Sequence, residues 1–268
     1  MAVLSVDLAY RRWTDLGIVV LDRTQLEEPS AECRLGALPI RCEILPSEAA
    51  GQNAGPVDAD ILAGRLNHLC AVRGIRVMML DGPQAWKSVT NGCVHARVSE
   101  RQLNTASKTG LPGMVKPVTY RVFAEFCLDV YDALGRRGWQ RLDTLAHPGS
   151  PPERVLVESY PHAAWKSLGL KPLPSKRRSR VSDLAEAYGA LRALIPITTS
   201  RPPNHDQLQA IVGGLPGLAL EERDTAAARI VGNAPRREGG HWREGFIVLP
   251  VPPSRPVPGT LSGIHWLD

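Results

Sequence analysis

The 268-residue chain lacks several patterns that would assign it to a common class of protein. It has no run of about 18 apolar residues, so no membrane-spanning helix is predicted. Its first residues, MAVLSVDLAY, carry Asp7 within an apolar stretch and no basic segment, which is not typical of a signal peptide. The five cysteines form no Cys-x-x-Cys pair, which argues against a zinc site or a disulfide framework. These absences favour a cytoplasmic protein with no membrane partner.

Common catalytic motifs are missing as well. There is no Gly-x-Ser-x-Gly sequence, no Walker A motif and no Gly-x-Gly-x-x-Gly loop. Cys93 and His95 lie two residues apart, a spacing that does not make them face each other on a helix. The formal net charge of +5 is compatible with a nucleic-acid partner but does not establish one.

What the sequence does contain is an alternation of short apolar runs and amphipathic segments. Apolar runs at 2–9, 16–22 and 36–45 predict an antiparallel meander, and runs at 75–83 and 153–159 predict two buried strands. Helical periodicity covers 56–74, with Asp58 as its cap and Gly74 as its end, and 120–138, with Thr119 as its cap. Further helices are predicted at 161–169, 182–195 and 205–220, and a late strand or packing segment at 245–250.

This order predicts an α/β fold. We expect a mixed five-stranded sheet, with three antiparallel strands followed by two parallel strands, and helices on both faces. A single domain is expected over residues 1–250, with a turn-rich insertion at about 83–116 and a proline-rich tail at 251–268.

Three acidic residues close predicted strands: Asp7, Asp81 and Glu158. If the first, fourth and fifth strands are parallel neighbours, these side chains share one edge of the sheet at about 5 Å spacing, where open α/β sheets bind ligands. Carboxylates this close repel by about 3 kcal/mol per pair at an effective dielectric constant near 20, which a divalent cation relieves. Oxygen ligands favour Mg²⁺ or Mn²⁺. Each acid alone is also compatible with a turn or a helix cap.

Later segments add further candidates. Asp206 and Gln209 are three residues apart on a predicted helix and share one of its faces. Residues 166–180 contain no acid and present Lys166, Lys176, Arg177, Arg178 and Arg180, which we interpret as contacts for nucleic-acid phosphates or as a solvated loop. Trp86 and Trp165 follow the Asp81 and Glu158 motifs, and core packing is favoured over base stacking for both.

Taken together, several segments resemble one family. SVDLAY, MMLDGP, VLVESYPHAAWKSLG, SKRRSRVSDLAEAYGALRAL, HDQLQAIVGG and REGFIVLP follow the order found in an uncharacterised family of predicted nucleases. That family belongs to the ribonuclease-H-like superfamily and is related to Holliday-junction resolvases. The resemblance covers about residues 2–250, and ESYPHAAW is its most specific block.

The resemblance implies a ribonuclease-H-like fold, in which strand one lies beside strand four and strand four beside strand five. It also implies phosphodiester hydrolysis with two Mg²⁺ or Mn²⁺ ions. The candidate catalytic and metal-binding residues are then Asp7, Asp81, Glu158 and Asp206, acting on DNA or RNA.

One position departs from the family. Its last helix typically reads Asp-Asp-x-x-Asp-Ala, whereas this chain has Gln209 where the last Asp is expected. A neutral amide offers a metal less than a carboxylate does. Several alternatives stay open: a slow or one-metal nuclease, a nucleic-acid-binding or adaptor protein with impaired catalysis, and a hydrolase of small phosphate compounds.

Overall fold

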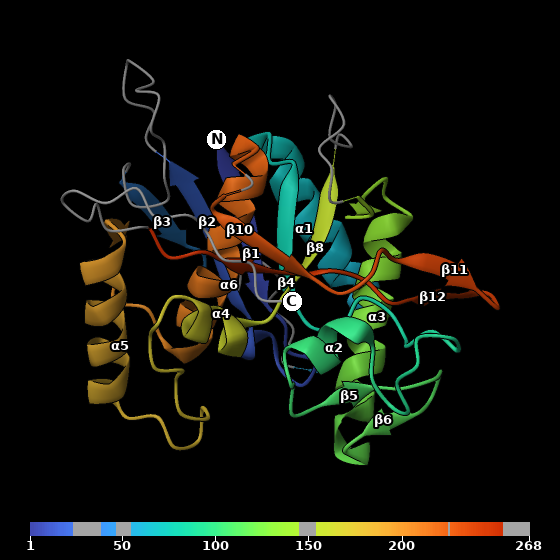
Figure 1. The fold of residues 1–268 in the computed structure, drawn as a ribbon. Coiled ribbons are helices and arrows are strands. Elements are labelled where there is room, and N and C mark those ends of the chain that lie inside the picture. The colour runs from blue at the N-terminus through green and yellow to red at the C-terminus, as the bar shows by residue number, and fades with distance from the viewer. Residues whose placement is uncertain (24–38, 47–54, 145–153, 225, 254–268) are drawn as a thin grey trace.

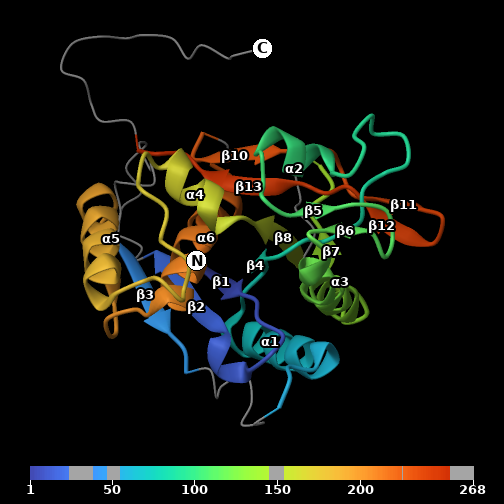
Figure 2. The same cartoon turned by 90° about the horizontal axis from the view of Figure 1, so that it is seen from below.

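The structure, a computed structural model, describes residues 1–23, 39–46, 55–144, 154–224 and 226–253. One mixed sheet lies between two layers of helices (Figure 1). Helices α1 (Ala59–Arg73) and α3 (Arg121–Gly135) cover one face of the sheet. The other face carries α4 (Pro161–Ser167), α5 (Val181–Leu194) and α6 (His205–Glu222) (Figure 2). No helix in these residues is long and apolar enough to cross a membrane.

The centre of the sheet follows the sequence prediction. Strand β1 (Ala2–Asp7) pairs antiparallel with β2 (Gly17–Arg23), and β2 pairs antiparallel with β3 (Ile40–Ile44). On its other side β1 pairs in parallel with β4 (Val77–Asp81), and β4 pairs in parallel with β8 (Val155–Ser159). The five predicted strands therefore lie in the order β3-β2-β1-β4-β8.

The prediction of five strands was too low, because the sheet in the described residues has nine. Strand β9 (Ile197–Thr199) pairs with β3, while β7 (Gln140–Arg141) and β13 (Ile247–Pro250) both pair with β8, and β10 (Ala228–Val231) pairs with β13. These four strands are two to four residues long. Strand β13 lies in the late strand or packing segment predicted at 245–250. The runs that form β7, β9 and β10 are too short to carry a period that a sequence pattern can reveal.

Alternation along the central strands divides the core into two layers. In β1, Val3 packs on the side of α6, whereas Leu4 and Val6 pack on the side of α1 and α3. Side chains two residues apart on a strand share a face. Asp7 therefore belongs to the same face of the sheet as Val3, which is the face that α6 covers.

The helix ends are predicted with mixed success. The Asp58 side chain accepts a hydrogen bond from the Ile61 amide at 2.8 Å, and Gly74 ends α1 in the left-handed conformation with φ 63°. Both predictions are confirmed. Thr119 was wrong as a cap, because it lies inside a 3₁₀ helix, η3 (Val118–Tyr120), that leads directly into α3.

Residues 83–116 are more structured than a turn-rich insertion. They contain α2 (Val98–Gln102) and a two-stranded ribbon of β5 (Lys108–Thr109) and β6 (Val115–Lys116). A second ribbon consists of β11 (Arg236–Glu238) and β12 (His241–Arg243), and one more 3₁₀ helix, η1 (Trp13–Asp15), follows β1. Most of the expected proline-rich tail, residues 254–268, lies outside the described residues.

Helix α6 packs against the sheet through glycine. A Cβ on Gly214 would lie 2.6 Å from the Ser5 Cβ and 2.7 Å from the Leu21 Cδ1, so only a hydrogen fits there. The Ser5 hydroxyl donates a 2.7 Å hydrogen bond to the Ala210 carbonyl. This contact fixes α6 over β1 and β2 and thereby sets the position of the first turn of α6.

Gly214→Ala is expected to lower the free energy of unfolding by about 1–3 kcal/mol, because the added methyl overpacks a closed contact. Urea denaturation measures the change. The matched control is Gly189→Ala on α5, where a Cβ meets nothing within 4 Å. That change should stabilise the protein by about 0.5–1 kcal/mol through helix propensity. Equal stability of the two variants would contradict the close approach of α6.

Candidate functional site

Asp7 and Asp81 lie side by side at the ends of β1 and β4. They are direct partners in the parallel register, and neighbouring strands are about 4.8 Å apart. Their side chains are hydrogen-bonded to each other and partly exposed. The expectation that these two carboxylates share one edge of the sheet is confirmed.

Simultaneous ionisation of both Asp7 and Asp81 is unfavourable. Burial raises the pKa of Asp7 well above its ordinary value, and the nearby carboxylates of Asp81 and Asp206 raise it further. Burial also raises the pKa of Asp81 to about 7, although its hydrogen bond with Asp7 opposes this rise. Without a cation the pair therefore retains a proton around neutral pH, because two adjacent carboxylates cannot both ionise cheaply.

Asp206 reaches the same face from the first turn of α6. The helix is capped by Asn204, whose side chain accepts a hydrogen bond from the Gln207 amide at 2.9 Å. A Cβ on Gly17 would lie 2.2 Å from the Asp206 carbonyl oxygen, and Gly17 is the residue opposite Asp7 in the β1–β2 register. The glycine on β2 thus lets the start of α6 approach the end of β1.

Both carboxylate oxygens of Asp206 already have partners. Its Oδ1 lies 3.2 Å from His205 Nδ1, and its Oδ2 accepts a hydrogen bond from Lys176 Nζ. The same ammonium group contacts Asp15 Oδ1 at 2.8 Å. Lys176, predicted from the sequence to contact nucleic acid, is therefore engaged with two aspartates. The other predicted contacts, Lys166, Arg177, Arg178 and Arg180, are exposed.

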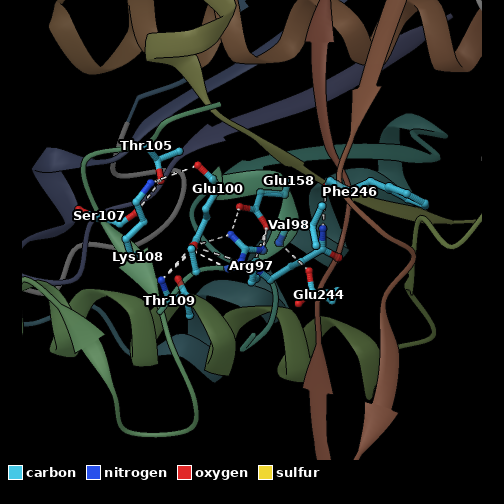
Figure 3. A network of polar contacts seen from close by, with 12 residues as sticks. Arg97, Val98, Glu100, Thr105, Ser107, Lys108, Thr109, Glu158, Glu244 and Phe246 are labelled. Atoms are coloured by element: carbon cyan, nitrogen blue, oxygen red, sulfur yellow. Dashed lines mark hydrogen bonds and ion pairs between the residues drawn. The ribbon is translucent and has the colours of Figure 1, made fainter. Parts of the chain in front are cut away.

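Glu158 is held by a different partner. Arg97 donates from Nη1 and Nη2 to its two carboxylate oxygens, each at 2.6 Å (Figure 3). The Gln84 amide donates to Oε2 at 3.0 Å. Arg97 and Glu158 are 1% and 3% exposed. Burial raises the pKa of Glu158, and Arg97 offsets part of that rise.

The register explains this placement. On β8 the partner of Asp81 is Ser159, whereas Glu158 pairs with Leu80. Because side chains alternate along a strand, Glu158 and Asp81 belong to opposite faces of the sheet. Glu158 thus lies at the same edge of the sheet as Asp81 but belongs to the other face, and it still contributes to the raised pKa of Asp81. Its role as a metal ligand stays a prediction.

Arg97 also anchors the 83–116 segment. It donates to Glu100 Oε1 from Nε at 3.2 Å and from Nη2 at 3.1 Å, and Glu100 accepts from the Thr109 amide at 2.9 Å (Figure 3). Glu244 accepts from the Val98 amide at 2.8 Å. Removing one member of a buried charge network typically costs about 3–5 kcal/mol. The segment is therefore tied down where it meets β8.

A pocket opens beside this network. Asp81, Arg97 and Glu158 contribute to its wall, and Tyr120 and Tyr160 contribute phenol rings. It thus adjoins the Asp7–Asp81 pair through Asp81.

Three other predictions have a structural outcome. Trp165 is fully buried and Trp86 is 8% exposed, so core packing is confirmed for both. The Trp165 indole donates a 2.9 Å hydrogen bond to Gln209 Oε1. The amide oxygen of Gln209 is therefore bonded to a core tryptophan.

Within the described residues, no group of three or more His, Cys, Asp or Glu side chains is arranged to hold a metal ion. The carboxylates of Asp206 and Glu158 are engaged by Lys176 and Arg97. No cationic side chain of the residues that the structure describes is bonded to Asp7 or Asp81.

No family model, curated protein or solved structure matches the chain.

Sequence analysis missed Glu100 and Asp15 as parts of the site, and it missed the pairing of Arg97 with Glu158. Arg97 lies 61 residues before Glu158, and Asp15 lies 161 residues before Lys176. The three-residue spacing of Arg97 and Glu100 in RVSERQ is a local signal for an ion pair. Nothing local indicates that Glu158 joins it.

The raised pKa of Asp81 predicts a pH-dependent effect of Asp81→Asn on stability. The folded protein holds the proton up to about pH 7, whereas the unfolded carboxyl loses it near pH 4. The contribution of this carboxyl to stability is thus complete below about pH 4 and is lost as the pH rises through 7. The difference in free energy of unfolding between Asp81→Asn and the unmutated protein should shift in favour of the variant by on the order of 1–3 kcal/mol between pH 4 and pH 8.

Urea denaturation at several pH values, in chelator-treated buffer, measures this difference. Glu186→Gln, which removes an exposed carboxylate of α5, is the control and should show no such trend. A difference for Asp81→Asn that stays constant with pH would contradict the shared proton.

Proposed function

We propose that the protein is a divalent-metal-dependent phosphodiesterase that cleaves DNA or RNA, with Asp7 and Asp81 as the carboxylates that bind the ion. The observation that carries the proposal is the direct register pairing of these two residues at the ends of parallel strands. The strand order β3-β2-β1-β4-β8 also agrees with the ribonuclease-H-like fold that the sequence resemblance implies. We include that fold in the proposal.

The two aspartates fit a hard divalent cation. They offer oxygen atoms only, they are partly exposed, and neither is bonded to a cationic side chain from the described part of the chain. Mg²⁺ is commonly bound through one or two carboxylates, with water and substrate phosphate completing the shell. A bound Mg²⁺ or Mn²⁺ would supply activation of water and stabilisation of the leaving oxygen.

The surrounding residues have separate roles in this proposal. Asp7 and Asp81 bind and orient the cation, and the hydrogen bond between them keeps the pair preformed. Arg97 fixes Glu158 and the wall of the pocket beside Asp81. The exposed Arg177 and Arg178 attract the phosphate backbone of a nucleic acid.

One observation favours the alternative of a non-catalytic nucleic-acid-binding protein. Gln209 occupies the position of an expected carboxylate, and its amide oxygen bonds to Trp165. A protein of that kind would bind nucleic acid in a salt-dependent manner without cleaving it. A hydrolase of small phosphate compounds would instead turn over its substrate without affinity for DNA or RNA.

Incubation of the full chain with labelled single-stranded DNA, four-way DNA junctions and RNA tests the proposal. Cleavage is expected in Mn²⁺ and should stop when EDTA is added. Asp7→Asn and Asp81→Asn should each lower the rate at least about 100-fold, because removal of a charge that stabilises the transition state typically costs this much.

Glu186→Gln is the control and should keep the full rate. If Asp7→Asn cleaved as fast as the unmutated protein, the assignment of the carboxylate pair would be wrong. Binding that ignores EDTA, with no cleavage of any substrate, would support the non-catalytic alternative.

A further inference from the structure

Lys176 lies among the acidic groups of the candidate site. Its ammonium group donates to Asp206 Oδ2 and to Asp15 Oδ1, the latter at 2.8 Å. Asp15 is also paired with Arg12, whose Nε lies 2.9 Å from Asp15 Oδ2. The ammonium group of Lys176 thus neutralises the Asp206 carboxylate, whose charge contributes to the raised pKa of Asp7.

The backbone around Lys176 is tied to α6. The amides of Arg178 and Ser179 donate to the Ser175 carbonyl at 2.7 and 3.1 Å, closing a turn around the lysine. The carbonyl of Pro174, just before this turn, lies 3.0 Å from His205 Nε2 at the start of α6. The lysine is therefore held at Asp206 by its own chain segment.

Charge balance limits what else the site can accept. Asp7, Asp81 and Asp206 carry a formal charge of −3 when all are ionised, and Lys176 supplies +1. The remaining −2 equals the charge of one divalent ion. A second divalent ion would need a further anionic ligand, and Gln209 is neutral with its amide oxygen bonded to Trp165.

We propose that Lys176 is a tethered cation that takes the place of a second divalent ion, so that the site binds one metal ion per chain. This inference rests on the proposed function, because it assumes that Asp7 and Asp81 bind the first ion. Lys176 acts as a positioning residue that fixes the Asp206 carboxylate. About half of its side chain is exposed.

Calorimetric titration of the full chain with Mn²⁺ alone tests the stoichiometry. The unmutated protein should bind one ion per chain. Lys176→Gln leaves the carboxylates of Asp206 and Asp15 facing a position without a cation, and it should bind two. Lys176→Arg keeps the charge and should bind one. Lys171→Gln, which alters an exposed lysine of the same segment, should also bind one.

The outcomes separate the two proposals. Two ions on the unmutated protein, or one ion on a folded Lys176→Gln variant, would overturn the inference and leave the metal site standing. No binding to any of the four proteins would overturn both. Circular dichroism checks that Lys176→Gln is folded, and the stoichiometry of the unmutated protein is a test that needs no variant.

Discussion

Parallel pairing of β1 with β4 forces two carboxylates into contact, and the rest of the site follows from that contact. Asp7 and Asp81 are partners in the register, so neither can move away without breaking the ladder. Burial raises both pKa values, and the nearby carboxylates of Asp81 and Asp206 raise that of Asp7 further. The nearby acids differ from this pair, because Asp206 forms a salt bridge with Lys176 and Glu158 forms one with Arg97. The Asp7–Asp81 pair is where we propose that a divalent cation binds.

The two faces of the sheet place different groups around this pair. On one face, glycine contacts allow α6 to approach β1 and β2 closely, which brings Asp206 and its lysine to the edge. On the other face, the Arg97–Glu158 pair anchors the 83–116 segment against β8 and shapes the pocket beside Asp81. Burying such a pair gains little stability by itself, but breaking it is costly. The Arg97–Glu158 pair therefore serves to fix the position of residues 83–116.

Sequence patterns predicted the centre of the fold well, because long apolar runs and helical periods are local. The three opening strands, β4, β8 and the capping of α1 by Asp58 all follow from such patterns. Edge strands of two to four residues did not, and neither did the 3₁₀ helix that displaces the expected cap at Thr119. For the site, Asp7 and Asp81 were predictable as strand-end neighbours. The orientation of Glu158 was not, because a one-residue difference in register reverses the face of a side chain. The partner of Lys176 was equally hidden, since it depends on contacts across 161 residues of chain.

The most direct test of the carboxylate pair is the effect of Mn²⁺ on the free energy of unfolding. A ligand that binds the folded state alone stabilises it by about 1.4–2.7 kcal/mol at ten to one hundred times its dissociation constant. We predict a stabilisation of this size for the unmutated protein and none for Asp7→Asn or Asp81→Asn. Equal stabilisation of all three proteins would place the ion elsewhere and contradict the account.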